Sequence, residues 1–213
     1  MKITILYDNE STQEDLIADW GFACLIEVYG RKILFDTGAS LEILLKNIKT
    51  LQIDVESIDE IFISHHHWDH MGGLPDLLSV HPFTVYLPPS CTVEQNHSKL
   101  IHLALPSCIH PNIFSTGELQ NIEQSLIIKT EKGLVIIVGC AHSKVENILK
   151  TASTFGEPMA LIGGLHDFNK FDLLDDLKLI CPTHCSEHKA EIKNLYPKKF
   201  LSGGVGKIIQ VKA

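Results

Sequence analysis

The sequence predicts an α/β protein in which helices cover the sheets. Two observations support this class: short apolar runs alternate with amphipathic segments, and polar side chains follow several of the apolar runs. The chain has 213 residues, of which 45% are hydrophobic, so it can bury a full core. Because no internal repeat or low-complexity linker interrupts it, we predict one domain over residues 1–213.

The first half is expected to hold four strands and one helix. Leucine and isoleucine recur at helical spacing in residues 41–48, which gives one core-facing stripe. Ser40 is the expected N-cap of this helix. Residues 29–31 form the expected turn of a hairpin. The strands are predicted at residues 3–7, 22–28, 32–35 and 59–64.

Residues 74–125 are predicted to form loops and short strands, because proline is frequent there and breaks helices. The histidines of this stretch are expected to be solvated. His97 and His102 are the two that we consider as substrate contacts.

The second half repeats the alternation of strands and helices. The glycine-rich run at residues 203–207 lacks the spacing of a phosphate-binding loop and is expected to be a turn. Strands are predicted at residues 134–138, 159–162, 179–181 and 207–211, and helices at residues 144–154, 173–178 and 187–195.

A histidine-rich run follows the predicted strand at residues 59–64. It contains His65, His67, Asp69 and His70, which are four potential metal ligands within six positions. Imidazole and carboxylate are the ligand types that hold zinc, iron or manganese. The alternative is a solvated polar loop, but the apolar strand that leads into the run favours a site at the end of a strand.

Three more histidines come just after predicted core strands: His142, His166 and His184. One histidine in such a place is more often structural than a ligand. Three with the same placement favour ligands, because two metals need more donors than one loop supplies. We therefore predict that later strand ends complete the metal site.

The His-x-His-x-Asp-His pattern after an apolar strand resembles the signature of the metallo-β-lactamase fold superfamily. Within it, the chain is similar to the branch of dihydropterin-ribofuranosylaminobenzene phosphate synthases and their uncharacterised bacterial relatives. This likeness extends to Asp8-Asn9, Trp20-Gly21-Phe22, Leu34-Phe35-Asp36-Thr37-Gly38, Gly139-Cys140-Ala141-His142, Gly163-Gly164-Leu165-His166 and Pro182-Thr183-His184-Cys185.

The resemblance implies a four-layer αββα sandwich with two divalent metal ions, zinc being the first expectation and iron or manganese the alternatives. One metal would be held by His65, His67 and His142. The other would be held by Asp69, His70 and His184. Asp69 would also orient the attacking water.

The chain departs from the common pattern of this superfamily, in which an aspartate bridges the metals. His166 stands in that interval and could be a ligand, a donor to a ligand, or a substrate contact. Asp167 could bridge only if its side chain pointed back toward the metals. By resemblance, Asp36 would accept the N–H of a ligand, and its alternative role is to cap a turn.

Other polar residues near the predicted ligands have more than one interpretation. Asp8 could support the site or the substrate, or belong to a plain turn. Lys144 could hold an anion at the start of a helix or be solvated. We expect Cys140 to be a small buried apolar residue, whereas Cys185 is equally compatible with a ligand, a redox-sensitive neighbour or a buried residue.

Composition restricts the partners and the compartment. A formal net charge of −8 argues against nonspecific nucleic-acid binding, and a single arginine, Arg31, leaves lysine, backbone amides or metal to hold any phosphate. Six cysteines are too few to suggest a disulfide framework. No apolar run approaches the roughly 20 residues that cross a bilayer. We expect a cytoplasmic protein with a small-molecule substrate.

Three functions are compatible with these residues. The first is a metal-dependent hydrolase acting on a small ester, phosphodiester or related substrate. The second, implied by the resemblance, is a transferase that joins a dihydropterin methyl diphosphate to an arylamine ribose phosphate and releases diphosphate. The third is a di-iron redox or sensing protein, because nitrogen and oxygen ligands also suit iron.

Overall fold

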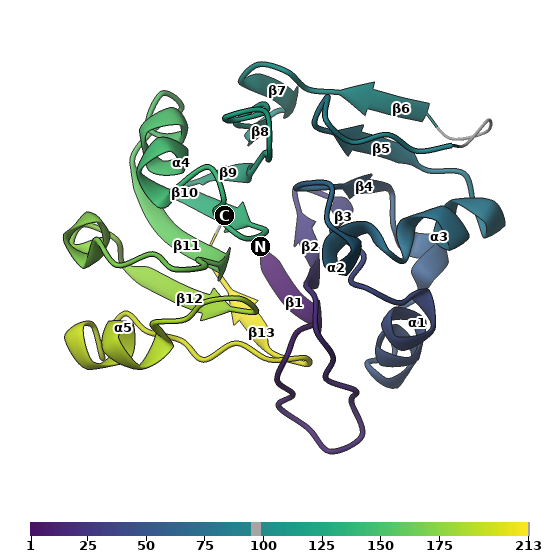
Figure 1. Ribbon diagram of the computed structural model, residues 1–213, viewed down its shortest axis with the longest axis horizontal. Helices are drawn as coiled ribbons and strands as arrows, with labels where there is room; N and C mark the ends of the chain where they lie inside the picture. Colours follow the sequence, from purple (N-terminus) through teal and green to yellow (C-terminus); the bar gives the residue numbers. More distant parts are fainter. Residues whose placement is uncertain (95–98, 213) are drawn as a thin grey trace.

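Two β-sheets pack face to face, and helices cover the outer face of each (Figure 1). The computed structural model describes residues 1–94 and 99–212, so His97 lies outside the described residues. One apolar cluster fills the space between the sheets. A second cluster joins one sheet to its helices, and a third does the same for the other sheet. The α/β prediction, with four αββα layers, is confirmed.

The first sheet has the strand order β13-β1-β2-β3-β4-β5-β6. Strands β13 to β3 pair in antiparallel fashion, whereas β3 to β6 are parallel. The carboxyl ends of β3 and β4 therefore meet at one edge. The strands are β1 (Lys2–Tyr7), β2 (Ala23–Val28), β3 (Arg31–Phe35), β4 (Glu60–Phe62), β5 (Thr84–Leu87), β6 (Lys99–His102) and β13 (Ile208–Gln210).

The second sheet has the order β12-β11-β10-β9-β8-β7. Its strands β10, β11 and β12 run parallel to one another, so their carboxyl ends also share an edge. Strand β9 was not predicted; it forms because its apolar residues pair with β10 in antiparallel register. The strands are β7 (Ser107–His110), β8 (Ile113–Ser115), β9 (Leu126–Thr130), β10 (Gly133–Val138), β11 (Pro158–Gly164) and β12 (Leu179–Thr183).

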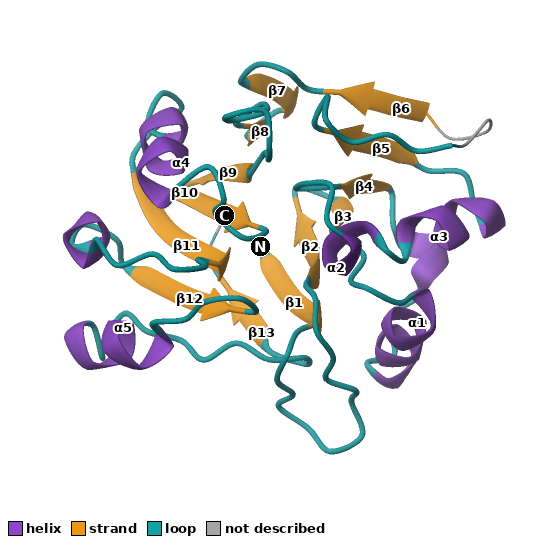
Figure 2. Cartoon of the chain, viewed as in Figure 1, coloured by secondary structure: helices purple, strands orange, loops and turns teal. Residues whose placement is uncertain are grey.

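The helices lie on the two outer faces (Figure 2). Helices α1 and α3 pack on the first sheet, and α4 and α5 pack on the second. None of the helices in the described part of the chain is long and apolar enough to cross a membrane. The helices are α1 (Leu41–Thr50), α2 (Trp68–Met71), α3 (Leu74–Val80), α4 (Val145–Ala152) and α5 (Lys189–Leu195), with 3₁₀ turns η1 (Val55–Ser57) and η2 (Phe171–Leu174).

Two local predictions were wrong and a third was incomplete. Ser40 is the N-cap of α1, as predicted, and its backbone carbonyl accepts the first helical N–H, but its side chain makes no capping hydrogen bond. A short 3₁₀ turn replaces the helix expected at residues 173–178, because Tyr196 and Lys199 donate to its free carbonyl groups. Helix α3 was missed in the proline-rich stretch, where Pro75 lies in the first turn and is tolerated. The remaining short strands there agree with the prediction.

Candidate metal centre

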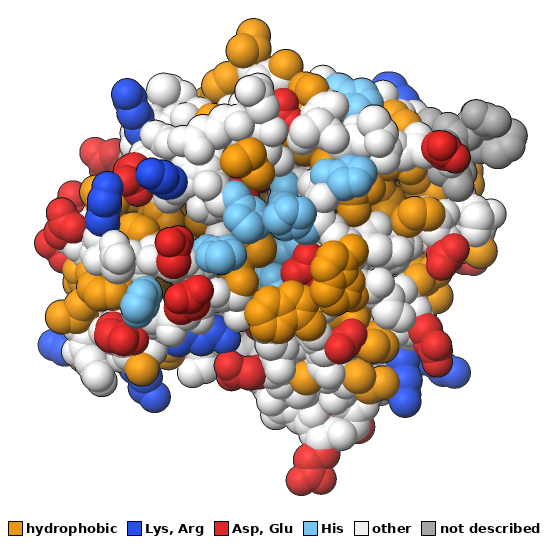
Figure 3. All heavy atoms as spheres, viewed as in Figure 1, with side chains coloured by type: hydrophobic (Ala, Val, Ile, Leu, Met, Phe, Trp, Pro, Cys, Tyr) orange, Lys and Arg blue, Asp and Glu red, His pale blue; other side chains and the backbone are white. Residues whose placement is uncertain are grey.

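The predicted ligands meet where the carboxyl ends of the parallel strands of both sheets face one another. His65, Asp69 and His70 follow β4, whereas His142, His166 and His184 follow β10, β11 and β12. Figure 3 shows histidine side chains gathered in the middle of this face of the molecule. Residues more than a hundred positions apart in the sequence therefore form one site.

His65 and His67 point ring nitrogens at each other, with His65 Nε2 and His67 Nδ1 3.0 Å apart. Ser64 donates its hydroxyl hydrogen to Asp36, so His65 Nδ1 donates to the Ser64 oxygen at 2.9 Å. This arrangement leaves the lone pair on His65 Nε2. The His65 ring is oriented as a ligand requires.

Asp36 accepts hydrogen bonds from two residues of the loop that follows β4. One carboxylate oxygen accepts the Ser64 backbone N–H at 2.7 Å, and the other accepts His70 Nδ1–H at 2.7 Å. Neither Asp36 nor His70 is exposed to solvent. Asp36 therefore lies where it accepts the N–H of a candidate ligand and leaves His70 Nε2 facing the site.

His184 is fixed by the two residues that follow β1, Asp8 and Asn9. Its Nδ1 lies 2.9 Å from Asn9 Oδ1, and its backbone N–H donates to Asp8 at 2.9 Å. Asp8 also accepts the backbone N–H of Gly204. Burial raises the pKa of the Asp8 carboxyl, although these backbone donors oppose the shift. Asp8 thus supports the His184 loop rather than facing the site.

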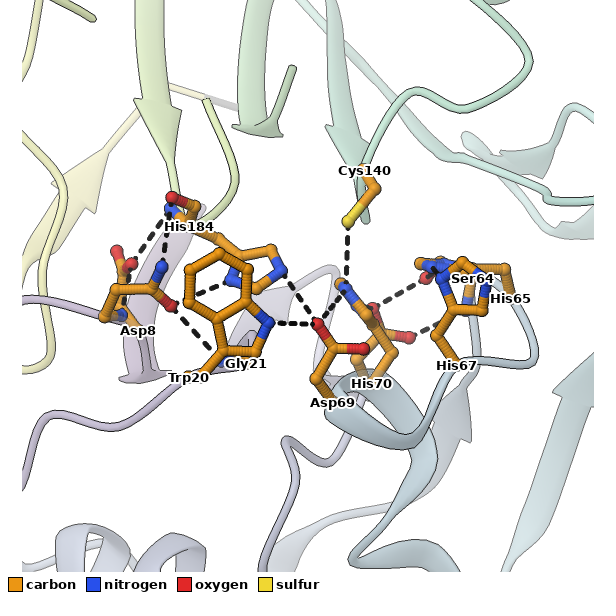
Figure 4. A network of polar contacts seen from close by, with 12 residues as sticks. Asp8, Trp20, Gly21, Ser64, His65, His67, Asp69, His70, Cys140 and His184 are labelled. Carbon is orange, nitrogen blue, oxygen red and sulfur yellow. Dashed lines mark hydrogen bonds and ion pairs between the residues drawn. The ribbon is translucent and has the colours of Figure 1, made fainter. Parts of the chain in front are cut away.

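Asp69 lies between the histidines of the two sheets (Figure 4). Its Oδ2 is 3.3 Å from His184 Nε2 and 3.9 Å from His70 Nε2, and it accepts the indole N–H of Trp20 at 2.9 Å. Burial raises the pKa of this carboxyl, but the close approach of His184 Nε2 and the nearby His70 ring outweigh it. The pKa therefore lies below its ordinary value. Asp69 is an ionised oxygen donor at neutral pH.

His142 and His166 lie side by side, with ring centroids 5.0 Å apart. The His142 ring also approaches His65 and His67, at centroid distances of 4.9 and 4.8 Å. The His166 side chain is 44% exposed, which places it at the rim. The Asp167 side chain is 87% exposed, so the idea that it bridges two metals is wrong: it points into solvent.

Cys140 is buried, as predicted, but its thiol faces polar groups instead of packing into an apolar layer. Its Sγ lies 3.1 Å from His70 Nε2, inside the site. The strand ends at Val138 and Ala141 has a φ of 56°, so the alternation of β10 does not extend to Cys140. The Cys185 thiol is hydrogen-bonded to that of Cys140. This contact raises the pKa of Cys140 and lowers that of Cys185.

The loops that carry the site have an unusual backbone. Several of their non-glycine residues adopt a left-handed conformation, which is uncommon for side chains with a Cβ and is concentrated at functional sites. This conformation turns each chain sharply after its strand and aims the following side chain along the sheet edge. The residues are Asp36, Ala141, Lys144, His166 and His184, with φ between 47° and 73°.

The donor atoms fit a divalent metal. His142 Nε2 and His184 Nε2 are buried and make no hydrogen bond, which is costly unless a cation occupies the space between them and their neighbours. Two nitrogens bound to one zinc in tetrahedral geometry lie about 3.3 Å apart, close to the His65–His67 separation. Burial lowers the pKa of His65 and His184, and brings that of His142 to about 4, so these rings are neutral donors.

A cavity of about 390 Å³ opens beside His142 and His166. Two lysines and two acidic residues line it, Lys144 and Lys170 with Glu146 and Asp167, and Lys170 is paired with Glu146. Phe168 adds an apolar surface. The cavity therefore combines an apolar surface with charged groups of both signs next to the histidines.

The comparison with protein families agrees with this architecture. Residues 21–107 match the model of the metallo-beta-lactamase superfamily. Over these residues the chain is similar to a metallo-β-lactamase superfamily domain. The solved structure of Tm1679, a metal-dependent hydrolase of the beta-lactamase superfamily, matches this chain with a TM-score of 0.82 and 25% sequence identity over 100% of both chains.

Two archaeal proteins of Methanocaldococcus jannaschii are also similar to this chain. One is 7,8-dihydropterin-6-methyl-4-(beta-D-ribofuranosyl)-aminobenzene-5'-phosphate synthase, which is 28% identical over 92% of this chain and 90% of its own length. The other is an uncharacterised protein, 28% identical over 98% of this chain and 100% of its own length. The similarity to the synthase branch predicted from the sequence is confirmed.

Sequence reasoning placed the candidate ligands but missed some of their neighbours. Trp20 was noted only as part of a motif, and its contact with Asp69 spans 49 positions in the chain. Ser64 was not singled out, although it precedes His65 and connects it to Asp36. Of the two histidines considered as substrate contacts, the described one, His102, lies 3.3 Å from the carbonyl of Pro88 and away from the cluster.

Proposed function

We propose that this protein is a metal-dependent hydrolase that cleaves a small ester, phosphodiester or related substrate with water. The proposal rests mainly on one observation: Asp69 and the histidines of both sheets converge beside an open cavity. Divalent metals bound there would lower the pKa of water to about 7 and polarise the oxygen under attack.

The side chains have distinct tasks in this proposal. His65, His67 and His142 would hold one metal, and His70, His184 and Asp69 the other. Zinc is the first candidate, with iron or manganese as alternatives. His166, at the rim beside His142, is placed to contact substrate or to add a ligand.

Asp69 orients the attacking water. Its carboxylate is ionised, and the indole N–H of Trp20 fixes one of its oxygens. A fixed carboxylate can accept a hydrogen bond from water and hold it facing the substrate. The water oxygen then bonds to the acyl carbon or phosphorus, and the ester oxygen leaves with a proton.

The cavity next to His142 would seat the substrate. Lys144 at its wall favours a negatively charged group, whereas Lys170 is paired with Glu146. Arg31 is paired with Glu60 and does not line this cavity. A phosphate or carboxylate would therefore rest against the Lys144 ammonium group at the cavity wall.

The test combines metal analysis with a substrate screen. The purified protein is loaded with zinc or manganese and assayed on nitrophenyl esters, bis-nitrophenyl phosphate and lactones, with the Asp69→Asn variant alongside. We expect turnover that a chelator abolishes and added metal restores, and at least a hundredfold loss in the variant. Activity that survives complete metal removal, or no activity on any class by the loaded protein, would contradict the proposal.

Transfer is the second candidate, because the synthase similarity extends over most of the chain. In that reaction an arylamine attacks a methyl diphosphate and diphosphate leaves. Diphosphate release that requires the arylamine would favour transfer, whereas uptake of labelled oxygen from water would favour hydrolysis. A purified protein that contains iron would instead favour a redox role.

A further inference from the structure

The Cys140 thiol lies between the two groups of candidate metal ligands. Its Sγ shares one compact set of donor atoms with His65 and His142, and a second compact set with His70 and His184. Within each set the donor atoms are within 4.8 Å of one another. Among the described residues, Cys140 is the side chain common to both sets. Figure 4 shows its sulfur pointing at His70 from the opposite sheet.

Among the described residues, three other side chains near the midpoint do not join both sets. Asp167 points into solvent. His166 stands at the rim beside His142. Asp69 Oδ2 approaches His184 and His70, which belong to one set only. The position between the metals is therefore open to sulfur.

We propose that Cys140 is a thiolate ligand shared by two divalent cations, an inference that rests on the metal site of the proposed function. The thiol proton passes to solvent when the metals bind, and no electrons are exchanged. A divalent cation deprotonates a coordinating thiol outright, so burial does not prevent this step. The unpartnered nitrogens of His142 and His184, one in each set, complete the donors around the sulfur.

Gly164 lies next to Cys140 and leaves room for it. A Cβ at Gly164 would lie 3.2 Å from the Cys140 Cα and 2.7 Å from the Cys185 sulfur. The missing side chain lets both cysteines lie against β11.

Cobalt substitution tests this assignment without an activity assay. Cobalt(II) bound by a thiolate gives a near-ultraviolet charge-transfer absorption that nitrogen and oxygen ligands do not give. We expect the band in the wild-type protein, its loss in Cys140→Ala, and its retention in the matched variant Cys185→Ala. Circular dichroism checks that each variant is folded. A band that survives in Cys140→Ala, or disappears only in Cys185→Ala, would overturn the assignment.

X-ray absorption of the wild-type zinc protein gives a second answer that needs no variant. A sulfur scatterer at about 2.3 Å from zinc is expected. Only nitrogen and oxygen neighbours, or a protein that binds no metal, would refute the shared thiolate. The two proposals can fail separately. Zinc–sulfur contacts in a protein without hydrolytic activity would support Cys140 as a ligand and contradict the hydrolase proposal. Hydrolysis by a protein without zinc–sulfur contacts would support the hydrolase proposal and contradict the shared thiolate.

Discussion

Asp36 accepts the Nδ1–H of His70 at 2.7 Å in a place where neither side chain is exposed to solvent. The same carboxylate oxygen accepts the Ser64 hydroxyl, which in turn accepts from His65. One buried carboxylate therefore sets the ring orientation of two candidate ligands. Such outer contacts fix which ring nitrogen faces a metal.

The Asp36→Asn variant should lose metal affinity. Asparagine keeps the shape of aspartate but replaces one acceptor oxygen with an NH2 donor, so the hydrogen bonds from Ser64 and His70 cannot all be kept. We expect zinc affinity to fall about 10- to 100-fold, as measured by competition with a chromophoric chelator. Asp15→Asn, on the exposed surface, is the control and should leave the affinity unchanged. Equal affinities for the two variants would show that Asp36 does not orient the ligands.

Trp20→Phe should lower turnover without removing the metals. The change keeps an aromatic ring but deletes the N–H that donates to Asp69 at 2.9 Å. A hydrogen bond to a charged group contributes about 1.5–3 kcal/mol, so we expect kcat to fall about 10- to 100-fold. Trp68→Phe is the matched control, since Trp68 is exposed. If the Trp20→Phe variant loses metal instead, Trp20 serves to position the metal ligands and not the attacking water.

The strand ends could be predicted because apolar runs are local in sequence. His142, His166 and His184 each follow such a run, and the parallel pairing of β10, β11 and β12 brings those ends to one edge. Parallel strands buried on both faces have continuous apolar sequences, so the pattern is easily recognised. The candidate ligands on the loop after β4 could be predicted for the same reason, because they also follow an apolar strand.

The orientation of Cys140 could not be predicted in the same way. It depends on a left-handed residue, Ala141, directly after the strand, and no residue type at that position indicates such a turn. The Trp20–Asp69 contact depends on the packing of a long loop against α2. Contacts between distant loops leave no periodic signal. The 3₁₀ turn at Phe171–Leu174 was mistaken for a helix because capping by Tyr196 is also a tertiary effect.

The Gly139→Ala variant should displace two side chains that support the site. An added Cβ would lie 2.2 Å from the Ser64 hydroxyl oxygen and 3.0 Å from His65 Nδ1, so both side chains must move. We expect at least a tenfold loss of zinc affinity. Gly30→Ala is the control: nothing lies within 4 Å of its Cβ, although its φ of 74° costs about 1 kcal/mol of stability. A Gly139→Ala variant with wild-type affinity would mean that the Ser64–His65 contact is dispensable.

Removing the metals should destabilise the fold. Without a cation, the buried nitrogens of His142 and His184 have no hydrogen-bond partner. A ligand that binds only the folded state adds about 4 kcal/mol to the free energy of unfolding at a thousand times its Kd. Calorimetry of the chelator-treated protein should therefore show a lower Tm that rises with each increment of zinc. The His184→Ala variant should show a smaller zinc-dependent rise, because it lacks one of these nitrogens. A Tm independent of zinc in the wild-type protein would mean that the cluster binds no metal in the folded state.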